Sequence, residues 1–123
     1  MAALDDEPDG IDDGDSNSDN LTIDVSIEDA GVVVVCLAGE IDISNAETVR
    51  VAVAAAVEHN AIEHDAALLV LDMGAVDFID SSGVTVLLQS AKLVRAFQIR
   101  RPSTAVRRII EMTGLSEMLP LTE

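Results

Sequence analysis

The sequence predicts an α/β fold in which three or more helices pack on a mixed, mostly parallel sheet of four to five strands. Residues 21–38 contain an alternating run and an apolar run separated by a glycine turn, which is typical of an antiparallel hairpin. Segments with helical spacing of apolar residues then alternate with short apolar runs, as in helices that connect parallel strands. A length of 123 residues is enough for one domain with a single core.

The hairpin is predicted from the patterns on either side of Gly31. Residues 21–27 alternate apolar and polar side chains, so one face of this strand is expected to meet solvent. Residues 32–38 form a continuous apolar run, which indicates a central strand covered on both faces. The single cysteine, Cys36, lies in that run without an internal disulfide partner, and we interpret it as a small buried hydrophobic residue.

Two helices with a buried strand between them are predicted next. Ser44 and Glu47 have the spacing of a capping box, and the apolar residues that follow at helical spacing predict a helix at residues 45–58. The short apolar run at residues 67–72 predicts the buried strand. Residues 82–96 again place apolar side chains on one helical face, which predicts the second helix.

The last part of the chain predicts a strand, a helix and an edge strand. Residues 97–100 are the candidate strand. Ser103 precedes a third apolar helical face, and Gly114 suits the left-handed conformation that ends many helices. Residues 117–121 are expected to form a short edge strand, because Pro120 has no amide hydrogen to give to a sheet ladder.

Charge is distributed unevenly along the chain. The sequence has 23 acidic and 7 basic residues, a net charge of −16. Residues 1–20 hold eight of the acids, no base and little apolar bulk, which predicts a disordered acidic tail before a folded domain at residues 21–123. Such acidity repels phosphate backbones and anionic lipid, so we expect no nucleic-acid partner. Six of the seven bases lie between Lys92 and Arg108, and we interpret them as a solvated face that balances nearby acids.

The ends and the apolar runs of the sequence bear on its cellular location. The N-terminus has neither the basic segment nor the apolar segment of a secretory signal. No apolar run approaches the roughly 20 residues that a membrane-spanning helix requires. We therefore expect a cytoplasmic protein without direct membrane insertion.

The segment "DFIDSSGV" raises the question of whether its serines, Ser81 and Ser82, are catalytic. A serine nucleophile needs a base within hydrogen-bonding distance, but His59 and His64 are predicted in a connection after a helix, at the opposite edge of the sheet. The strained G-x-S-x-G turn is also missing, because Ile79 stands two residues before Ser81. We therefore predict no enzyme activity, no catalytic residue, no cofactor and no metal site.

The simplest role for "DSSG" is to cap a helix that begins near Gly83. Asp80, Ser81 and Ser82 are each good N-cap residues, and the cap needs only one of them. At least one serine is left at a solvent-facing corner, where a helix N-terminus tolerates a phosphate. Phosphorylation would add about −1.5 to −2 charges beside Asp80. A charge switch on partner binding is therefore the functional hypothesis.

Three segments together resemble a known family. They are "LAGEIDISNAETV" at residues 37–49, "LDMGAVDFIDSSGVTVLL" at residues 71–88 and "AVRRIIEMTGL" at residues 105–115. In this order and spacing they resemble the STAS domain of bacterial anti-sigma factor antagonists, over residues 21–121. The resemblance implies a STAS-like fold and a role in transcription regulation by sigma factors, typical of bacterial stress responses.

The resemblance also implies a partner-switching mechanism. Such antagonists bind an anti-sigma factor with serine-kinase activity and so release a sigma factor; the kinase phosphorylates the first serine of D-S-S-G, here Ser81, and a PP2C-type phosphatase removes the phosphate. The implied partner-binding residues are Asp42, Ser44, Asn45, Asp80, Ser81, Ser82 and Gly83, with Ser82 as the expected helix cap. Asp42 has a second interpretation as a turn residue. The alternative function is a phosphorylation-independent STAS domain that binds a lipid or small ligand, or serves as an accessory subunit of a membrane transporter.

Overall fold

The computed structural model describes residues 20–29, 31–64 and 68–123. The predicted disordered tail, residues 1–20, lies outside the described residues except for Asn20. Asn20 is tied to the folded domain, because its carbonyl accepts a hydrogen bond of 2.7 Å from the Glu40 amide.

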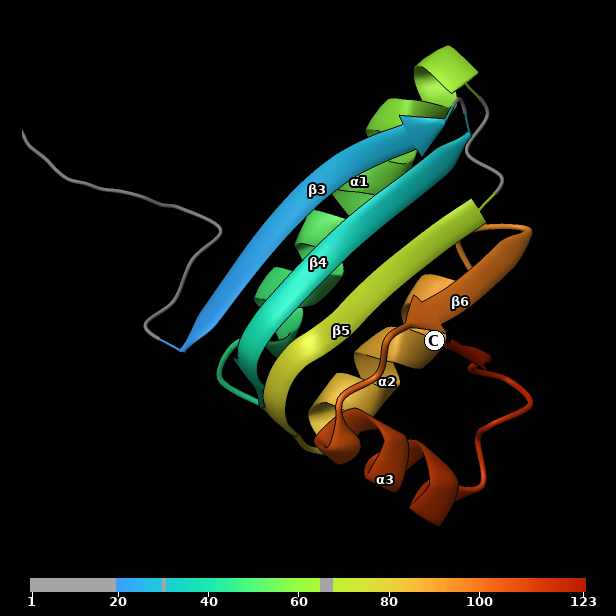
Figure 1. Ribbon diagram of the computed structural model, residues 1–123. Helices are drawn as coiled ribbons and strands as arrows, with labels where there is room; N and C mark the ends of the chain where they lie inside the picture. Colours follow the sequence, from blue (N-terminus) through green and yellow to red (C-terminus); the bar gives the residue numbers. More distant parts are fainter. Residues whose placement is uncertain (1–19, 30, 65–67) are drawn as a thin grey trace, which may run out of the picture.

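The centre of the fold is one five-stranded mixed sheet, as Figure 1 shows. Along the sheet the strands follow their order in the chain, and they are β3 (Leu21–Asp29), β4 (Val32–Ile41), β5 (Leu68–Ile79), β6 (Ala96–Arg100) and β7 (Leu121–Thr122). Strand β3 is antiparallel to β4, and the other neighbours are parallel. The predicted hairpin and the mixed, mostly parallel sheet are therefore confirmed.

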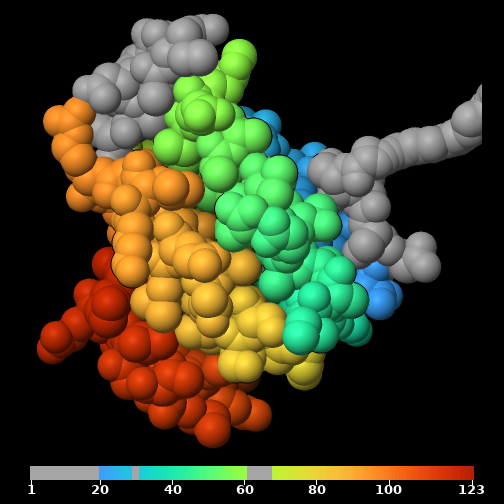
Figure 2. Space-filling model, turned by 180° about the vertical axis from the view of Figure 1, so that it is seen from behind, coloured from blue at the N-terminus to red at the C-terminus, as the bar shows by residue number. Residues whose placement is uncertain are grey.

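In the part of the chain that the structure describes, three helices connect the parallel strands: α1 (Ala46–His64), α2 (Ser81–Ala91) and α3 (Thr104–Thr113). Helices α1 and α2 lie side by side on one face of the sheet, and α3 contacts β5 (Figures 1 and 2). The predicted α/β class with three or more helices is confirmed.

Two predicted helices differ in length from the observed ones. Helix α1 continues to His64, so His59 and His64 belong to this helix and their placement in a connecting loop was wrong. Residues 58–64 contain no glycine or proline to stop the helix. Helix α2 ends at Ala91 instead of residue 96. The amide of its C-cap residue Lys92 donates to the Gln89 carbonyl, and the Leu93 amide donates to the Ser90 carbonyl.

Strand β5 is longer than the apolar run that predicted it, because it continues to Ile79. Its pairing with β4 shifts register between Cys36 and Ala38 and again between Gly39 and Glu40. These irregularities break the simple alternation of buried and exposed side chains beyond Asp72, which hid the strand from pattern analysis.

The C-terminal elements agree well with prediction. Ser103 is the N-cap of α3, and Gly114 ends the helix with a left-handed φ of 72°. The strand at residues 97–100 is confirmed as β6. The edge strand expected at residues 117–121 was placed too early: residues 117–119 lie in a turn, and β7 is the two-residue strand Leu121–Thr122 directly after Pro120.

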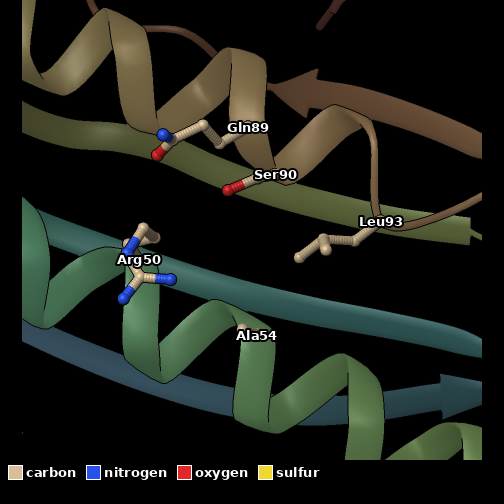
Figure 3. A pocket seen from close by; sticks show the side chains of 5 residues that line it. All are labelled: Arg50, Ala54, Gln89, Ser90 and Leu93. Atoms are coloured by element: carbon tan, nitrogen blue, oxygen red, sulfur yellow. The ribbon is translucent and has the colours of Figure 1, made fainter.

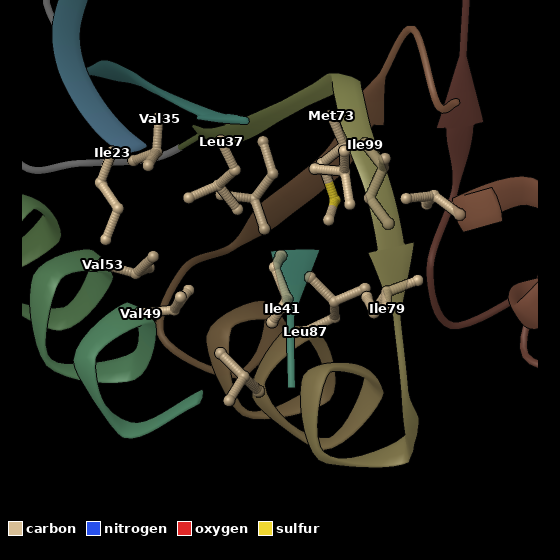
Figure 4. Close-up of a cluster of buried hydrophobic side chains, with 14 of the residues drawn as sticks. Ile23, Val35, Leu37, Ile41, Val49, Val53, Met73, Ile79, Leu87 and Ile99 are labelled. Carbon is tan, nitrogen blue, oxygen red and sulfur yellow. The ribbon is translucent and has the colours of Figure 1, made fainter. Parts of the chain in front are cut away.

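The core lies between the sheet and the helices (Figure 4). Leu37 of β4 and Met73 of β5 are almost fully buried, and Val49 and Val53 of α1 and Leu87 of α2 pack into the same cluster. Burying a side chain of this size contributes about 1.5–3 kcal/mol. Apolar positions at helical and strand spacing therefore hold the sheet and helices together.

The opposite face of the sheet corrects the interpretation of Cys36. We expected β4 to be covered on both faces, but Cys36 is exposed. Consecutive parallel strands that lie next to each other, joined by right-handed crossovers, place their connecting helices on the same face. Helices α1 and α2 therefore lie on the other face of β4 from Cys36, which is exposed although Val34 on its own face is buried. Cys36 is paired with Asp24 in β3 and with Asp72 in β5. Partial burial and the nearby Asp72 carboxylate raise the pKa of the Cys36 thiol.

Candidate functional site

The carboxyl ends of β4 and β5 bring the two predicted loops together. Ile41 pairs with Ile79 at the end of the parallel ladder, and the Asp80 amide donates to the Ile41 carbonyl at 3.2 Å. The loop after β4 starts at Asp42 and the turn after β5 leads into Ser81, so both lie at one edge of the sheet. In α/β folds this edge is the usual place for a functional site. We call residues 40–45 and 77–83 the Ser81 corner.

Asp80 caps α2, so the expectation that Ser82 is the cap was wrong. Asp80 has extended backbone angles, and its Oδ1 accepts hydrogen bonds from the amides of Ser82 at 2.9 Å and Gly83 at 3.2 Å. The ladder bond to Ile41 fixes the Asp80 backbone in this extended conformation, which an N-cap residue requires. The cap is therefore the last residue before the helix, with a carboxylate in place of a hydroxyl.

Ser81 is the first residue of α2 and its side chain is exposed. Its carbonyl accepts a hydrogen bond from the Thr85 hydroxyl at 3.1 Å. Within the described part of the chain, no hydrogen bond involves the Ser81 hydroxyl itself. Because Asp80 accepts hydrogen bonds from the amides of Ser82 and Gly83, the Ser81 hydroxyl is not needed as a helix cap and is free for other chemistry.

Ser82 and Gly83 lie in packed surroundings. Ser82 is half-buried and Gly83 is buried. A Cβ atom on Gly83 would lie 2.6 Å from Cγ1 of Ile79 and 3.0 Å from Cγ2 of Ile41. The glycine therefore allows the first turn of α2 to pack directly on the ends of β4 and β5.

The loop after β4 is held by its own side chains. Oδ1 of Asp42 accepts hydrogen bonds from the Ser44 hydroxyl at 2.5 Å and from the Ser44 amide at 2.9 Å. These two bonds, the hydroxyl first, lower the pKa of the Asp42 carboxyl. Glu47 instead pairs with Arg50, so the predicted capping box between Ser44 and Glu47 does not form.

Asn45 is buried, which limits what it can offer a partner. Its Oδ1 accepts from the Asp42 amide at 3.0 Å, and its Nδ2 donates to the Glu40 carbonyl at 2.8 Å. Only 4% of its surface is exposed. Asn45 therefore shapes the loop, while Asp42, Ser44 and Ser81 present polar atoms at the surface.

Two apolar residues of the Ser81 corner were missed by the sequence analysis. Ile43 is 82% exposed in the loop after β4, and Phe78 is 48% exposed near the end of β5. Large apolar side chains in the core of an interface contribute much of its binding energy. The signal for Ile43 was an apolar residue between polar ones in a loop, whereas Phe78 was hidden by the irregular end of its strand.

The Ser81 corner is acidic. Glu40, Asp42, Asp77 and Asp80 all belong to it, and residues 40–45 and 77–83 contain no base. His59 lies on α1 roughly 20 Å along the helix from its first residue, Ala46, by the rise of 1.5 Å per residue. The start of α1 is the end beside the Ser81 corner, so no described histidine is placed to act as a base for Ser81.

The bases after Lys92 are largely engaged with acids. Arg100 binds Glu28 at 3.0 Å, and Arg101 binds Asp72 at 2.7 Å. Arg107 binds Glu123 at 2.7 Å. These ion pairs agree with the interpretation of a face that balances nearby acids.

A groove lies between α1 and α2 (Figure 3). It has a volume of about 230 Å³ and is lined by Arg50, Ala54, Gln89, Ser90 and Leu93. Small-molecule pockets usually measure about 300–1,000 Å³. The groove includes none of the residues predicted for function.

Comparison with known proteins assigns the family. The STAS domain family matches residues 25–123. This chain belongs to the STAS family. An anti-sigma F factor antagonist of Paenibacillus polymyxa is 30% identical over 106 residues, which cover 83% of this chain and 86% of that protein. The predicted resemblance is therefore confirmed.

Solved structures support the same assignment. The crystal structure of an anti-sigma factor antagonist from Mycobacterium paratuberculosis is 33% identical, has a TM-score of 0.72, and the match covers 86% of this chain and 88% of that one. The Bacillus cell fate determinant SpoIIAA in its phosphorylated form has a TM-score of 0.62 at 21% identity, with 83% and 92% of the two chains covered. This second likeness concerns the fold alone. Among the described helices, none is both long and apolar enough to cross a membrane.

Proposed function

We propose that this protein is a cytoplasmic anti-sigma factor antagonist that phosphorylation of Ser81 switches off. In the unmodified state it binds an anti-sigma factor with serine-kinase activity, and a sigma factor is released. The observation that carries the proposal is the free, exposed Ser81 hydroxyl, which lies next to a helix cap supplied by Asp80. The names of the relatives support the antagonist role.

The partner surface consists of the exposed polar and apolar groups of the Ser81 corner. Ile43 and Phe78 supply apolar contacts, and the Asp42 carboxylate is held in place by Ser44. Asp80, Ser82, Gly83 and Asn45 maintain the geometry. A partner that accepts this surface presents an apolar recess with basic side chains at its rim, because the corner is acidic.

Phosphorylation acts on the interface rather than on the fold. Asp80 already accepts hydrogen bonds from the amides of Ser82 and Gly83, so a phosphate on the exposed Ser81 finds these two amides occupied and projects into solvent. Two unit charges about 4 Å apart interact by roughly 4 kcal/mol at an effective dielectric constant near 20. Salt and solvent reduce this value at an exposed corner, and we expect a loss of affinity of about tenfold to hundredfold.

The same exposure allows a phosphatase to remove the phosphate. A phosphate on Ser81 lies outside the packed core, where a PP2C-type phosphatase can reach it and restore binding. SpoIIAA, which shares the fold, exists in a phosphorylated form. The alternative of a lipid-binding or transporter-associated STAS domain would need a ligand pocket, and the groove between α1 and α2 is smaller than usual ligand pockets. The hollow on α1 lined by Thr48, Val51, Ala52 and Ala55 has a volume of about 380 Å³, which is within the usual range, but it contains none of the residues predicted for function.

Binding measurements on charge variants test the proposal. Purified full-length protein is titrated with a kinase-type anti-sigma factor from the same genome. Ser81→Ala is expected to bind like the unmodified protein, and Ser81→Glu to bind about tenfold or more weakly. Ser116→Glu adds the same charge to an exposed turn after α3 and is expected to bind normally. Equal binding by Ser81→Glu and Ser116→Glu would contradict the charge switch.

A further inference from the structure

Helices α1 and α2 leave one face of the sheet to the strands themselves. We call this face, on which the exposed Cys36 lies, the outer face. Figure 1 shows β3, β4 and β5 in front of α1, and Figure 2, seen from behind, shows α1 in front of β3. Side chains on the outer face of these strands are therefore expected to meet solvent. Asp24 and Ser26 of β3 do so, as Cys36 of β4 does.

Two valines on the outer face are nevertheless buried. Val34 of β4 is 1% exposed and Val70 of β5 is 3% exposed. They are register partners, so they lie side by side on neighbouring strands. The core cluster contains the residues before and after each of them, such as Val33 and Val35, but neither valine itself. Because successive side chains of a strand point to opposite faces, Val34 and Val70 form a separate apolar pair on the outer face.

An ion pair crosses the outer face between two strands that are not neighbours. Arg100 of β6 and Glu28 of β3 meet at 3.0 Å, although β4 and β5 lie between their strands. Three strand spacings of about 4.8 Å separate β3 from β6, so the two side chains must extend over the intervening strands. Along this path, Nε of Arg100 lies 3.8 Å from Oδ2 of Asp72, its register partner on β5.

The register of the sheet places the two buried valines under this ion pair. Val34 and Val70 belong to one row of paired residues, which meets β3 at Ser26. Arg100 lies two residues beyond that row along β6. Glu28 lies two residues beyond it along β3, which runs in the opposite direction. The line that joins Arg100 to Glu28 therefore crosses the row between β4 and β5, where the valines lie.

The ion pair is open to solvent and salt. The side chain of Arg100 is 28% exposed and that of Glu28 is 49% exposed. Ion pairs with this exposure are weak, and dissolved salt screens them. A cover made by these two side chains is therefore easily opened.

We propose that Arg100 and Glu28 form a strap across the outer face, which closes over Val34 and Val70 and opens when the ion pair is weakened. In the closed state the outer face presents charged and polar groups. In the open state the two valines reach solvent, and the face gains an apolar patch. The strap is a salt-sensitive conformational device that is separate from the phosphorylation switch, because neither of its residues belongs to the Ser81 corner.

The test measures how closely a dissolved molecule approaches the valine methyl groups. The full chain, with 13C-labelled valine methyls, is mixed with an uncharged gadolinium chelate, and paramagnetic relaxation is recorded for each methyl. Glu28→Ala removes one end of the strap, and we expect the relaxation of Val34 and Val70 to rise about twofold to fivefold. Asp24→Ala is the matched control: it removes an exposed carboxylate from the same face of β3, where the described residues form no ion pair with it, and no rise is expected.

A second arm uses the unmodified protein, so it does not depend on the folding of a variant. In about 1 M NaCl the Debye length falls to about 3 Å, and the relaxation of Val34 and Val70 is expected to rise as it does in Glu28→Ala. Methyls of Val33 and Val35, fully buried on the inner face of the same strand, are expected to stay protected throughout.

Two results would overturn the proposal. Unchanged relaxation of Val34 and Val70 in Glu28→Ala and in high salt would show that something other than the strap covers them. An equal rise at Val33 and Val35 would show general loosening of the sheet instead of an opening strap.

Discussion

The N-terminal turns of α2 and α3 are built alike but use their serines differently. Before α3, the half-buried Ser103 is itself the cap: its hydroxyl oxygen accepts a hydrogen bond of 3.2 Å from the Val106 amide. Before α2, the Asp80 carboxylate accepts hydrogen bonds from two amides, and Ser81 is exposed. The hydroxyl of a serine that caps a helix is engaged in a hydrogen bond, whereas the hydroxyl of a serine that follows an acidic cap is free for modification.

The third helical residue also differs between the two turns. In α2 it is Gly83, which lies against Ile79 and Ile41 at the ends of the central strands. In α3 it is Val106, which is fully buried in the core. The first turn of α2 therefore packs closely on the sheet edge through Gly83, and the first turn of α3 is held by the buried side chain of Val106.

The largest expected effect is that of Gly83→Val. The new side chain overlaps Ile79 and Ile41, and overpacking of this kind costs about 1–3 kcal/mol or more of unfolding free energy. Urea denaturation of the variant measures the loss. Thr85→Val, which places the same side chain at an exposed position of the same helix, is the control and is expected to lose less than about 1 kcal/mol.

A second prediction concerns the anchor of α3. Val106→Ala removes two buried methyl groups, and we expect a loss of about 2 kcal/mol in the free energy of unfolding. The same measurement on Thr104→Ala, two residues earlier and exposed, gives the baseline. Equal stability of Val106→Ala and Thr104→Ala would show that the buried valine does not hold the helix.

The caps themselves give the most direct contrast. Ser103→Ala removes the cap of α3 and is expected to cost about 1 kcal/mol of unfolding free energy. Ser81→Ala removes a hydroxyl without described partners and should change stability by less than about 0.5 kcal/mol. Thermal or urea unfolding of the two variants, measured side by side, gives the two losses of unfolding free energy. If Ser81→Ala lost as much stability as Ser103→Ala, the assignment of Asp80 as the sole cap would be wrong.

The smallest effect is electrostatic. The Ser44 hydroxyl and amide lower the pKa of Asp42, so any stability that this carboxylate contributes is present above its ordinary pKa and is lost as pH falls through the lowered value. Ser44→Ala removes the hydroxyl and should move the pKa of Asp42 back towards its ordinary value. Carbon-detected NMR titration of the Asp42 carboxyl reports the shift, and an unchanged pKa in Ser44→Ala would contradict the hydrogen bond.

The sequence predicted the elements more reliably than their ends. The hairpin, the parallel strands and α3 follow from side-chain periodicity and from clear signals such as Ser103 and Gly114. The end of α1 carries no glycine or proline, and the end of β5 is irregular, so their extents depend on packing that a local pattern does not contain.

The Ser81 corner was predictable in part. The family resemblance placed Ser81 and Asp42 in neighbouring loops, and they do lie at the same sheet edge. The choice of Asp80 over Ser82 as the cap depends on the ladder bond that fixes the Asp80 backbone, which only the paired strands reveal. The exposure of Cys36 likewise depends on the order of strands in the sheet and on the face that the helices cover.

Mapping of phosphate after incubation with ATP and kinase-type anti-sigma factors from the same genome tests the central claim most directly. Intact-mass spectrometry and peptide mapping are expected to find one phosphate, on Ser81, and none on the capping residue Ser103. The Ser81→Ala variant is expected to remain unlabelled while still binding the kinase. A phosphate on Ser82 or Ser103, or equal labelling of Ser81→Ala and the unmodified sequence, would contradict the account.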